Sequence, residues 1–389
     1  MPPYTTHVCL VSAQATPNLL PALDEAWRPR TLVLACSTQM KHAAAALRSV
    51  VQTKCPGLAV QVLDLPNAYD YGALSDTFLN YLADHADDNI ALNVTGGTKL
   101  MAVAAQEVFR SAGKPVFYVN VETDEVIVIG EKAPSQPLRA KMKVHEMLRA
   151  HGYSVSVQEQ PQITRELRDL TARLIDHVAS AGRALGAINS LARSARDLPG
   201  LKAELTPAQY DSRSLMDMLA LFADAHLLRQ TGQVVQFRDE DARFFVNGGW
   251  LEAHVFEALQ SLRAQHEGLS DVAMGVRVAF DGKAKEKNEI DVAFLYRNTL
   301  HLIECKTANL AQGGKGDDNK ATEALYKMES LLKLGGLRTR GMVVDYRGEL
   351  AKSEANQKRA AEAGIAIVSG AQLKDLKGAI SRLWLGKQG

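Results

Sequence analysis

The first 130 residues alternate between short apolar runs and helical stretches, and this alternation restricts the chain to few folds. Runs of β-branched and aliphatic residues are expected to form strands buried on both faces. Such runs occupy residues 7–13, 30–37, 58–65, 89–94 and 115–122, with helical patterns at 38–54, 75–86 and 98–113. Strands that alternate with helices form a mostly parallel sheet covered on both faces. The sequence therefore predicts an α/β, Rossmann-like N-terminal domain.

The chain has 389 residues, which is more than one hydrophobic core usually organises. A linker is predicted near residues 131–141, which contain two prolines, so the N-terminal domain is placed at residues 1–135. Residues 136–248 are predicted to hold a linker and a helical region. Within it, a helix at 214–232 precedes two strands around an Asp-Glu-Asp-Ala turn, which is typical of a winged-helix-like element. Residues 249–389 begin with a helix and continue as a second mixed α/β domain.

The composition is that of an ordinary globular protein, with 46% hydrophobic and 23% charged residues. The net charge is +1, so any contact with nucleic acid must depend on a local patch. No apolar run approaches the roughly 18 residues that span a membrane, and no signal peptide is apparent. The cysteines at positions 9, 36, 55 and 305 show no spacing typical of zinc sites or disulfide scaffolds. We therefore expect a cytoplasmic protein without membrane contact.

Two apolar strands, at residues 288–296 and 300–307, are separated by a gap of hairpin length. If residues 297–298 form a two-residue turn, the register places Asp291 opposite Glu304. Opposed side chains have Cβ atoms about 4.5–5.5 Å apart, and two like charges there are destabilising without a cation. Mg²⁺ and Mn²⁺ are hard ions that prefer oxygen ligands, so one of them is expected at this pair. A turn longer by one residue would shift the pairing.

Lys306 follows Glu304 by two residues, so both side chains lie on the same face of the strand. An ammonium in that place could hold an attacking water or stabilise charge on a phosphodiester transition state. The ordinary alternative is a solvated strand end that carries a surface ion pair.

The spacing D-x12-E-x-K, on adjacent strands after a helix with a glutamate, resembles the PD-(D/E)xK nuclease fold. The resemblance implies that Asp291 and Glu304 are the metal-binding acids and that Lys306 is the catalytic lysine. It also implies an additional catalytic acid at Glu252 on the preceding helix, and a metal ligand in the backbone carbonyl of Cys305. The proline that often precedes the first acid is an isoleucine here.

Several neighbours of this pattern have two interpretations. Glu252 could be a ligand or a surface residue, and the same holds for Glu289. On the following helix, Lys327 could face the site, whereas Tyr326 is more simply structural. The lysine- and glycine-rich segments 281–289 and 311–320 could guide a phosphate backbone, although exposed loops often have this composition.

Small hydroxyl and amide residues follow three of the N-terminal strands. Glycines let a backbone approach a ligand closely, and N–H groups at a helix start bind anions. The spacing of a Walker A loop and the dinucleotide fingerprint are both absent. This set suits a polar ligand with adenine and phosphate groups. The candidate binding residues are Ser12, Gln14, Thr16, Ser37, Thr38, Gln39, Thr95, Gly96, Gly97, Thr98 and Lys99.

The Thr-Gly-Gly-Thr-Lys element between a strand and a helix resembles the CARF domain, the cyclic-oligoadenylate sensor of type III CRISPR systems. A CARF domain, a winged-helix-like middle and a restriction-endonuclease-like C-terminal domain resemble the CARF nucleases of that antiviral defence, over nearly the whole chain. The resemblance implies a homodimer that binds a cyclic oligoadenylate, most often cyclic tetra-adenylate, across its two-fold axis. Binding would allosterically activate a hydrolase that cuts DNA or RNA with Mn²⁺ or Mg²⁺.

Two other functions fit the same sequence. A nucleotide-responsive transcription regulator would use the winged-helix-like region and carry an inactive nuclease-like domain. A restriction-type endonuclease would cut without a ligand and use its N-terminal domain to recognise DNA. The intact Asp291, Glu304 and Lys306 set favours the ligand-activated nuclease over the regulator.

Overall fold

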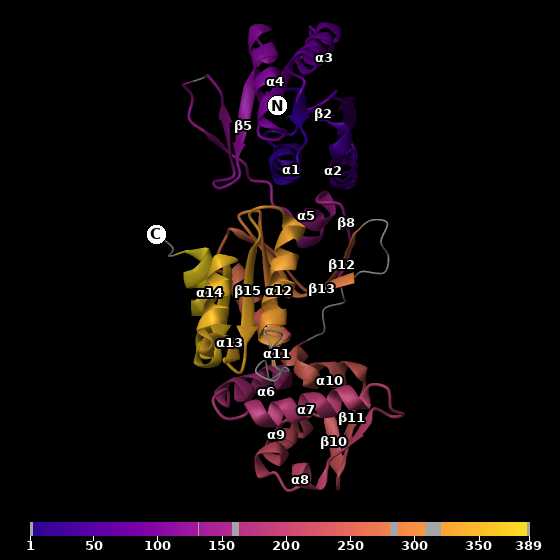
Figure 1. Ribbon diagram of the computed structural model, residues 1–389, viewed down its shortest axis with the longest axis vertical. Coiled ribbons are helices and arrows are strands. Elements are labelled where there is room, and N and C mark those ends of the chain that lie inside the picture. The colour runs from indigo at the N-terminus through magenta and orange to yellow at the C-terminus, as the bar shows by residue number, and fades with distance from the viewer. Residues whose placement is uncertain (1–2, 131, 158–162, 281–286, 308–319, 387–389) are drawn as a thin grey trace.

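The computed structural model describes residues 3–130, 132–157, 163–280, 287–307 and 320–386. Three units follow one another along the longest axis of the molecule, with the N-terminal unit at one end (Figure 1). The C-terminal unit lies in the middle, and the unit built from the central part of the sequence lies at the other end. Within the described ranges, no helix is both long and apolar enough to cross a lipid bilayer.

The N-terminal unit is an α/β domain, as predicted. Its strands are β1 (Thr6–Leu10), β2 (Thr31–Cys36), β3 (Ala59–Asp64), β4 (Ile90–Asn93), β5 (Val116–Asn120), β6 (Glu125–Val128) and β7 (Gln136–Pro137). Its helices are α1 (Thr16–Leu23), η1 (Thr38–Met40), α2 (Lys41–Lys54), α3 (Tyr71–Asp84) and α4 (Lys99–Ser111). The seven-stranded sheet has the order β3-β2-β1-β4-β5-β6-β7, with β1 to β5 parallel. Val8 and Cys9 of β1 belong to different hydrophobic clusters, because helices cover both faces of the sheet.

The C-terminal unit is a six-stranded mixed sheet in the order β16-β15-β14-β13-β12-β8. Its strands are β8 (Tyr153–Val157), β12 (Leu269–Phe280), β13 (Lys287–Tyr296), β14 (Thr299–Lys306), β15 (Arg340–Asp345) and β16 (Ile365–Ser369). Its helices are α5 (Val144–Ala150), α11 (Trp250–Arg263), α12 (Lys320–Leu332), α13 (Glu349–Lys352), α14 (Glu354–Glu362) and α15 (Leu376–Ile380), with short segments η3 (Lys333–Gly335), η4 (Gly370–Asp375) and η5 (Ser381–Leu385). The range predicted for the helical region, 136–248, contributes β8 to this sheet. β8 pairs with β12 and so satisfies the backbone hydrogen bonds of that strand's other side.

The central unit, residues 163–249, combines helices with a three-stranded sheet in the order β10-β11-β9. It contains α6 (Arg165–Asp176), α7 (Gly182–Ala195), β9 (Lys202–Glu204), α8 (Pro207–Tyr210), α9 (Arg213–Asp224), β10 (Leu228–Thr231), β11 (Val234–Phe237), α10 (Glu240–Phe244) and η2 (Phe245–Gly249). The hairpin turn predicted at residues 239–242 is wrong, because the turn lies between Thr231 and Val234. Asp239 instead caps α10, since its carboxylate accepts from Ala242 N–H at 2.7 Å.

The predicted turn between β13 and β14 is confirmed. Tyr296 pairs with Thr299, and the same register continues to Val292 and Ile303. Arg297 and Asn298 have φ angles of 46° and 49°, which is the left-handed geometry of a type I′ hairpin turn. We call the two strands with this turn the catalytic ribbon, residues 287–306, after the roles that the sequence predicts for Asp291, Glu304 and Lys306.

The turn of the catalytic ribbon is attached to the N-terminal unit. The buried Asn298 amide donates to Asp124 Oδ2 and to the Ala140 carbonyl, both at 3.0 Å. Its carbonyl oxygen accepts from Met142 N–H at 3.1 Å. One side chain therefore joins the ribbon to the hairpin of β5 and β6 and to the segment between the two units.

Asn298→Gly is expected to lower the free energy of unfolding by about 2–4 kcal/mol, because buried partners lose their hydrogen bonds. Glycine tolerates the left-handed turn, so the substitution tests the three bonds and not the turn. The measurement is the midpoint and slope of chemical denaturation. Arg297→Gly is the matched control, since Arg297 is exposed. Equal stability of the two variants would contradict the assigned role of Asn298.

Candidate active site and sensor site

The catalytic ribbon brings its two predicted acids together. Asp291 and Glu304 are 9% and 0% exposed, each one residue beyond the last recorded cross-strand pair of the ribbon. Cys305 N–H donates to Asp291 Oδ2 at 2.7 Å, which fixes the Asp291 carboxylate against β14. Their interior position is costly for two carboxylates, because burial disfavours the charged form.

Two lysines hold the inner carboxylate. Lys306 Nζ lies 2.5 Å from Glu304 Oε1, and Lys327 Nζ of α12 lies 2.6 Å from the same oxygen. The other oxygen, Glu304 Oε2, is buried without a hydrogen-bond partner among the described residues. The structure thus shows Lys327 in the site. From the sequence, Lys327 could only be assigned to the helix that follows the ribbon. Its contact with Glu304 could not be predicted, because the contact depends on how α12 packs on the sheet.

Tyr326 packs against Arg359, and none of its interactions among the described residues is with Asp291, Glu304 or Lys306. The side chain is 50% exposed, and the Arg359 guanidinium lies 4.8 Å from the centre of its ring. Glu289 forms an ion pair with Arg277 at 3.7 Å on the neighbouring strand.

The electrostatic environment shows how closely the acids interact. Burial, followed by the charge of Glu304, raises the pKa of Asp291 to about 7. Burial and the nearby Asp291, Glu289 and Glu304 raise the pKa of Glu252 on α11 to about 9. Burial acts to lower the pKa of Lys306, but the charges of the neighbouring Glu304 and Asp291 together outweigh burial, and the pKa is raised. Glu252 therefore belongs electrostatically to the same site, and added positive charge would stabilise all three carboxylates.

The described residues fit a divalent ion only in part. Among the residues with described positions, no group of three or more His, Cys, Asp or Glu side chains is arranged to hold a metal. In favour of an ion, Glu304 Oε2 is a buried oxygen with no hydrogen-bond partner in the described parts of the chain. Against it, Glu304 Oε1 is already shared by two ammonium groups. Burial raises the pKa of the Cys305 thiol well above its usual range, so only its backbone carbonyl is a candidate ligand.

Asp291→Asn is expected to raise the melting temperature of the metal-free protein at pH 8. Because the pKa of Asp291 is raised to about 7, the folded protein binds a proton that the unfolded chain releases at about pH 4. The stability of the wild type therefore falls as the pH rises from about 4 through about 7. Asparagine has no charge to bury and still offers an oxygen to Cys305 N–H. The gain is therefore largest above pH 7 and vanishes near pH 4.

This prediction is tested by thermal unfolding in a chelator between pH 4.5 and 8.5. Asp76→Asn, at an exposed position of α3, is the control for removing one negative charge. A wild-type protein that is more stable than Asp291→Asn at pH 8 would contradict the proposed cost of this carboxylate.

The glycine loop after β4 is fixed by close packing. A methyl group at Gly96 would overlap the Leu10 carbonyl oxygen, and Gly97 has a φ of 74°. Thr98 caps α4 by accepting from Met101 N–H at 3.2 Å. Thr95 accepts from Val119 N–H at 2.7 Å, which ties the loop to β5. Thr95 and Thr98 thus have structural hydrogen bonds, whereas Lys99 is exposed.

The carboxyl ends of the N-terminal strands face the C-terminal unit. A cavity of about 230 Å³ lies between the two units, and its lining includes Ser12, Gln14, Thr16 and Thr95. A neighbouring cavity of about 770 Å³ is lined by Ser12, Gln14 and Gln39 and by residues of the C-terminal unit. Gln14 already bridges the two units, since its Oε1 accepts from Leu337 N–H at 3.3 Å.

Five of the eleven predicted binding residues therefore line these two inter-unit cavities. The others do not: Ser37 is buried, Thr38 and Lys99 are exposed, and Gly96, Gly97 and Thr98 shape the loop. The segments 281–286 and 308–319, which hold most of the predicted lysine-rich loops, lie outside the described residues.

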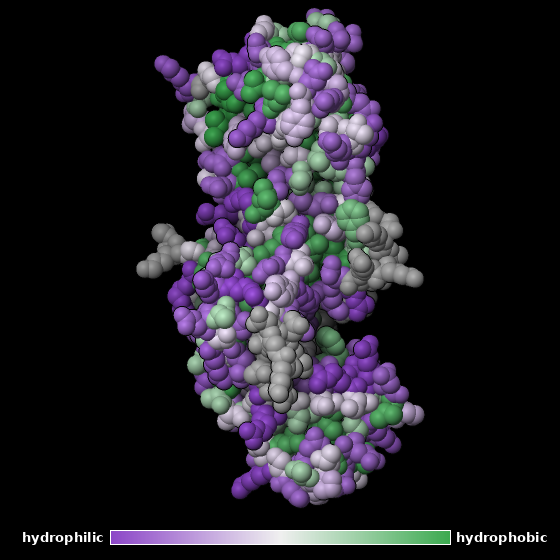
Figure 2. Space-filling view, in the orientation of Figure 1, coloured by the Kyte–Doolittle hydropathy of each residue, from purple (hydrophilic) through white to green (hydrophobic). Residues whose placement is uncertain are grey.

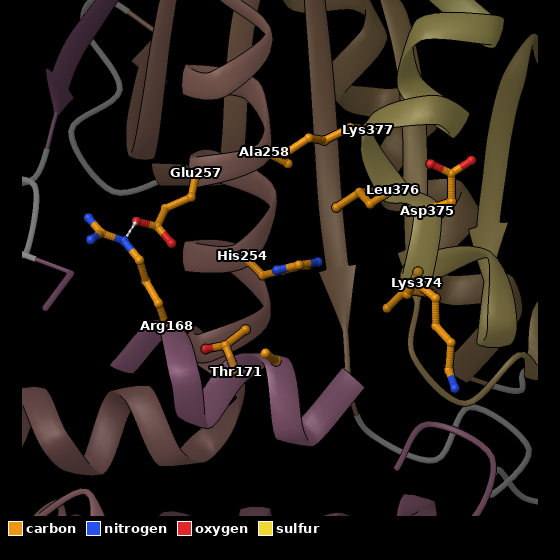
Figure 3. A pocket seen from close by; sticks show the side chains of 11 residues that line it. Arg168, Thr171, His254, Glu257, Ala258, Lys374, Asp375, Leu376 and Lys377 are labelled. Carbon is orange, nitrogen blue, oxygen red and sulfur yellow. Dashed lines mark hydrogen bonds and ion pairs between the residues drawn. The ribbon is translucent and has the colours of Figure 1, made fainter. Parts of the chain in front are cut away.

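Another cavity, of about 320 Å³, lies where the central unit meets the C-terminal unit (Figure 3). His254 of α11 lies in it, between α6 and the segment of Lys374 to Lys377. Arg168 Nε of α6 and Glu257 Oε1 of α11 form an ion pair at 2.5 Å on one side. None of the predicted site residues lines this cavity, so the junction is distinct from the acids of the catalytic ribbon.

Two domain families match the chain. Residues 6–147 match the Card1 CARF domain, and residues 239–385 match the Card1-like endonuclease domain. No curated protein is significantly similar to the chain.

Two solved structures match nearly the whole chain, and a third matches it less closely. The protein VC1899 from Vibrio cholerae has a TM-score of 0.87 at 25% identity, with 98% of both chains covered. Can2 from Sulfobacillus thermosulfidooxidans, in complex with cyclic tetra-adenylate, has a TM-score of 0.77 at 24% identity, covering 98% of this chain and 97% of Can2. A type III CRISPR defence DNA nuclease activated by cyclic oligoadenylate has a TM-score of 0.53 at 17% identity, covering 87% of this chain and 45% of that one.

The fold and the ribbon of buried acids define a CARF sensor domain joined to an endonuclease domain, as the sequence predicted. The chain therefore combines a domain of the Card1 CARF family with a domain of the Card1-like endonuclease family.

Proposed function

We propose that this chain is a cytoplasmic, metal-dependent endonuclease that cyclic tetra-adenylate activates. The observation that carries the proposal is the catalytic ribbon, where two buried acids and two lysines converge in a chain with a Card1-type CARF domain. A structural ion pair alone would not require a second buried acid with a raised pKa beside Glu304.

Mn²⁺ or Mg²⁺ is the proposed cofactor, with Asp291, Glu304 and the Cys305 carbonyl as its ligands. Such an ion supplies Lewis-acid stabilisation and activation of water for phosphodiester hydrolysis. Release of Lys306 and Lys327 from Glu304 would free their ammonium groups for a phosphodiester oxygen. Glu252, with a pKa raised to about 9, can hold or donate a proton at the edge of the site.

The proposed activator site is formed by the strand ends of the sensor domain. Ser12, Gln14, Thr16, Gln39 and Thr95 supply hydroxyl and amide groups to the inter-unit cavities. The other predicted residues are proposed to shape this site or to lie at its rim: Ser37, Thr38, Gly96, Gly97, Thr98 and Lys99. A ligand there would contact both units, so it could bind one arrangement of the two units more tightly than another. Such a difference in affinity is what a ligand needs to shift the protein toward its active arrangement.

The active form is proposed to be a homodimer with the activator on its two-fold axis. Exposed hydrophobic side chains lie on the sensor domain, including Leu79 of α3, Val103 of α4 and Tyr118 of β5. Figure 2 shows hydrophobic residues gathered over this unit. Exposed apolar surface of this kind is typical of association sites.

The test is a cleavage assay with the purified full-length chain, labelled single- and double-stranded DNA and RNA, and Mn²⁺ or Mg²⁺. Cleavage is expected only with both metal and cyclic tetra-adenylate, and not for Glu304→Gln. Cleavage that ignores cyclic tetra-adenylate would instead indicate a restriction-type endonuclease. Sequence-specific duplex binding without cleavage would indicate a transcription regulator.

A further inference from the structure

Arg347 lies beside the catalytic ribbon, directly after β15. β14 and β15 are parallel, with Lys306 opposite Asp345, and Tyr346 N–H donates to the Lys306 carbonyl at 2.9 Å. The chain then turns at once, because the buried Asp345 carboxylate accepts from Arg347 N–H at 3.1 Å and from Leu350 N–H at 2.8 Å. The position of Arg347 relative to Lys306 is therefore fixed by backbone hydrogen bonds.

The Arg347 side chain lies along one face of α7. A methyl group at Gly182 would be 3.2 Å from Arg347 Nε, and one at Gly186 would be 3.2 Å from Nη1. One turn further, Asn189 Nδ2 donates to Thr307 Oγ1 at 2.9 Å. Gly182, Gly186 and Asn189 share a helix face by their spacing. The guanidinium thus lies about one helical turn, roughly 5 Å along α7, from the residue that follows Lys306.

Within the part of the chain that the structure describes, the Arg347 guanidinium has no anionic partner. Among the described residues, Arg347 forms only the backbone bond to Asp345, and its half-buried side chain makes no ion pair. The first turn of α7 carries partial positive charge, so the helix gives this cation no compensation. The position of Arg347 is therefore not explained by an ion pair. Gly182 and Gly186, which lack side chains, leave room for its guanidinium beside α7.

We propose that Arg347 is a substrate-binding residue, whose guanidinium holds a backbone phosphate of the nucleic acid next to the phosphodiester cleaved at the catalytic ribbon. This inference rests on the proposed nuclease function. Arginine suits the role because its planar fork donates two parallel hydrogen bonds to phosphate. Lys306 and Lys327 both pair with Glu304 in this structure, whereas the charge of Arg347 is not paired with any acid of the described residues.

The test uses the full-length chain with cyclic tetra-adenylate and a fluorescent single-stranded oligonucleotide in a chelator. Arg347→Met keeps the apolar stem and removes the charge. We expect the affinity for the oligonucleotide to fall by about tenfold or more. The slope of log affinity against log salt concentration should be smaller by about 1. Arg347→Lys should keep the salt slope and recover only part of the affinity. Arg263→Ala, at an exposed position at the far end of α11, is the charge control.

With metal added, KM for cleavage should rise in Arg347→Met while the melting temperature stays unchanged. If Arg347→Met binds the oligonucleotide with the affinity and the salt dependence of the wild type, the proposal is wrong, even if the wild type cleaves. A wild-type chain that neither binds nor cleaves with activator and metal refutes the nuclease function itself, so the two failures are distinguishable.

Discussion

Glu304→Gln and Lys306→Ala are each expected to lower activator-dependent cleavage by about 10²–10³-fold or more. The Glu304 carboxylate is fully buried and holds both lysines of the site, so its neutral amide analogue removes the charge that organises them. Lys306→Ala removes one of two ammonium groups, yet Lys327 remains to pair with Glu304. The measurement is the initial cleavage rate at saturating cyclic tetra-adenylate and Mn²⁺.

Loss of folding is separated from loss of chemistry by two controls. Lys358→Ala removes a lysine from an exposed position of the same domain, and its rate should match the wild type. Binding of cyclic tetra-adenylate by each variant should be retained, because neither Glu304 nor Lys306 lines the inter-unit cavities. Wild-type rates in both Glu304→Gln and Lys306→Ala would contradict the assignment of the ribbon as the active site.

Gly96→Ala is expected to abolish activation, or to raise the activator concentration that it requires by about 10²-fold. The added methyl group would overlap the Leu10 carbonyl oxygen and lie 3.4 Å from Ser12 Oγ. The loop after β4 must then move away from β1, and Ser12 lines both inter-unit cavities. The measurement is an activator titration of cleavage at fixed metal and substrate.

Gly57→Ala is the matched control for this substitution. It adds the same methyl group in the same domain, but nothing lies within 4 Å of it. Its activation curve should equal that of the wild type. Superimposable curves for Gly96→Ala and Gly57→Ala would show that the glycine loop does not shape the activator site.

The sequence by itself determined the features that depend on short-range geometry. Strand periodicity placed Glu304 and Lys306 on one face, and the Arg297-Asn298 turn set the register from Tyr296 to Val292 that brings Asp291 toward β14. The same reasoning failed where two local signals competed. At Asp239, a helix cap and a turn call for the same residue types, and the structure uses the cap.

Only the tertiary structure decided which distant segments meet. Lys327 reaches Glu304 because α12 packs on the sheet, β8 joins β12 across more than a hundred residues, and α7 lies against Arg347. It also decided that the sensor strands end at the C-terminal unit, where Gln14 meets Leu337. The physical reason is that local hydrogen bonding and side-chain alternation act over a few residues. Contacts between units depend on the shapes of complete surfaces, which exist only once each unit has folded.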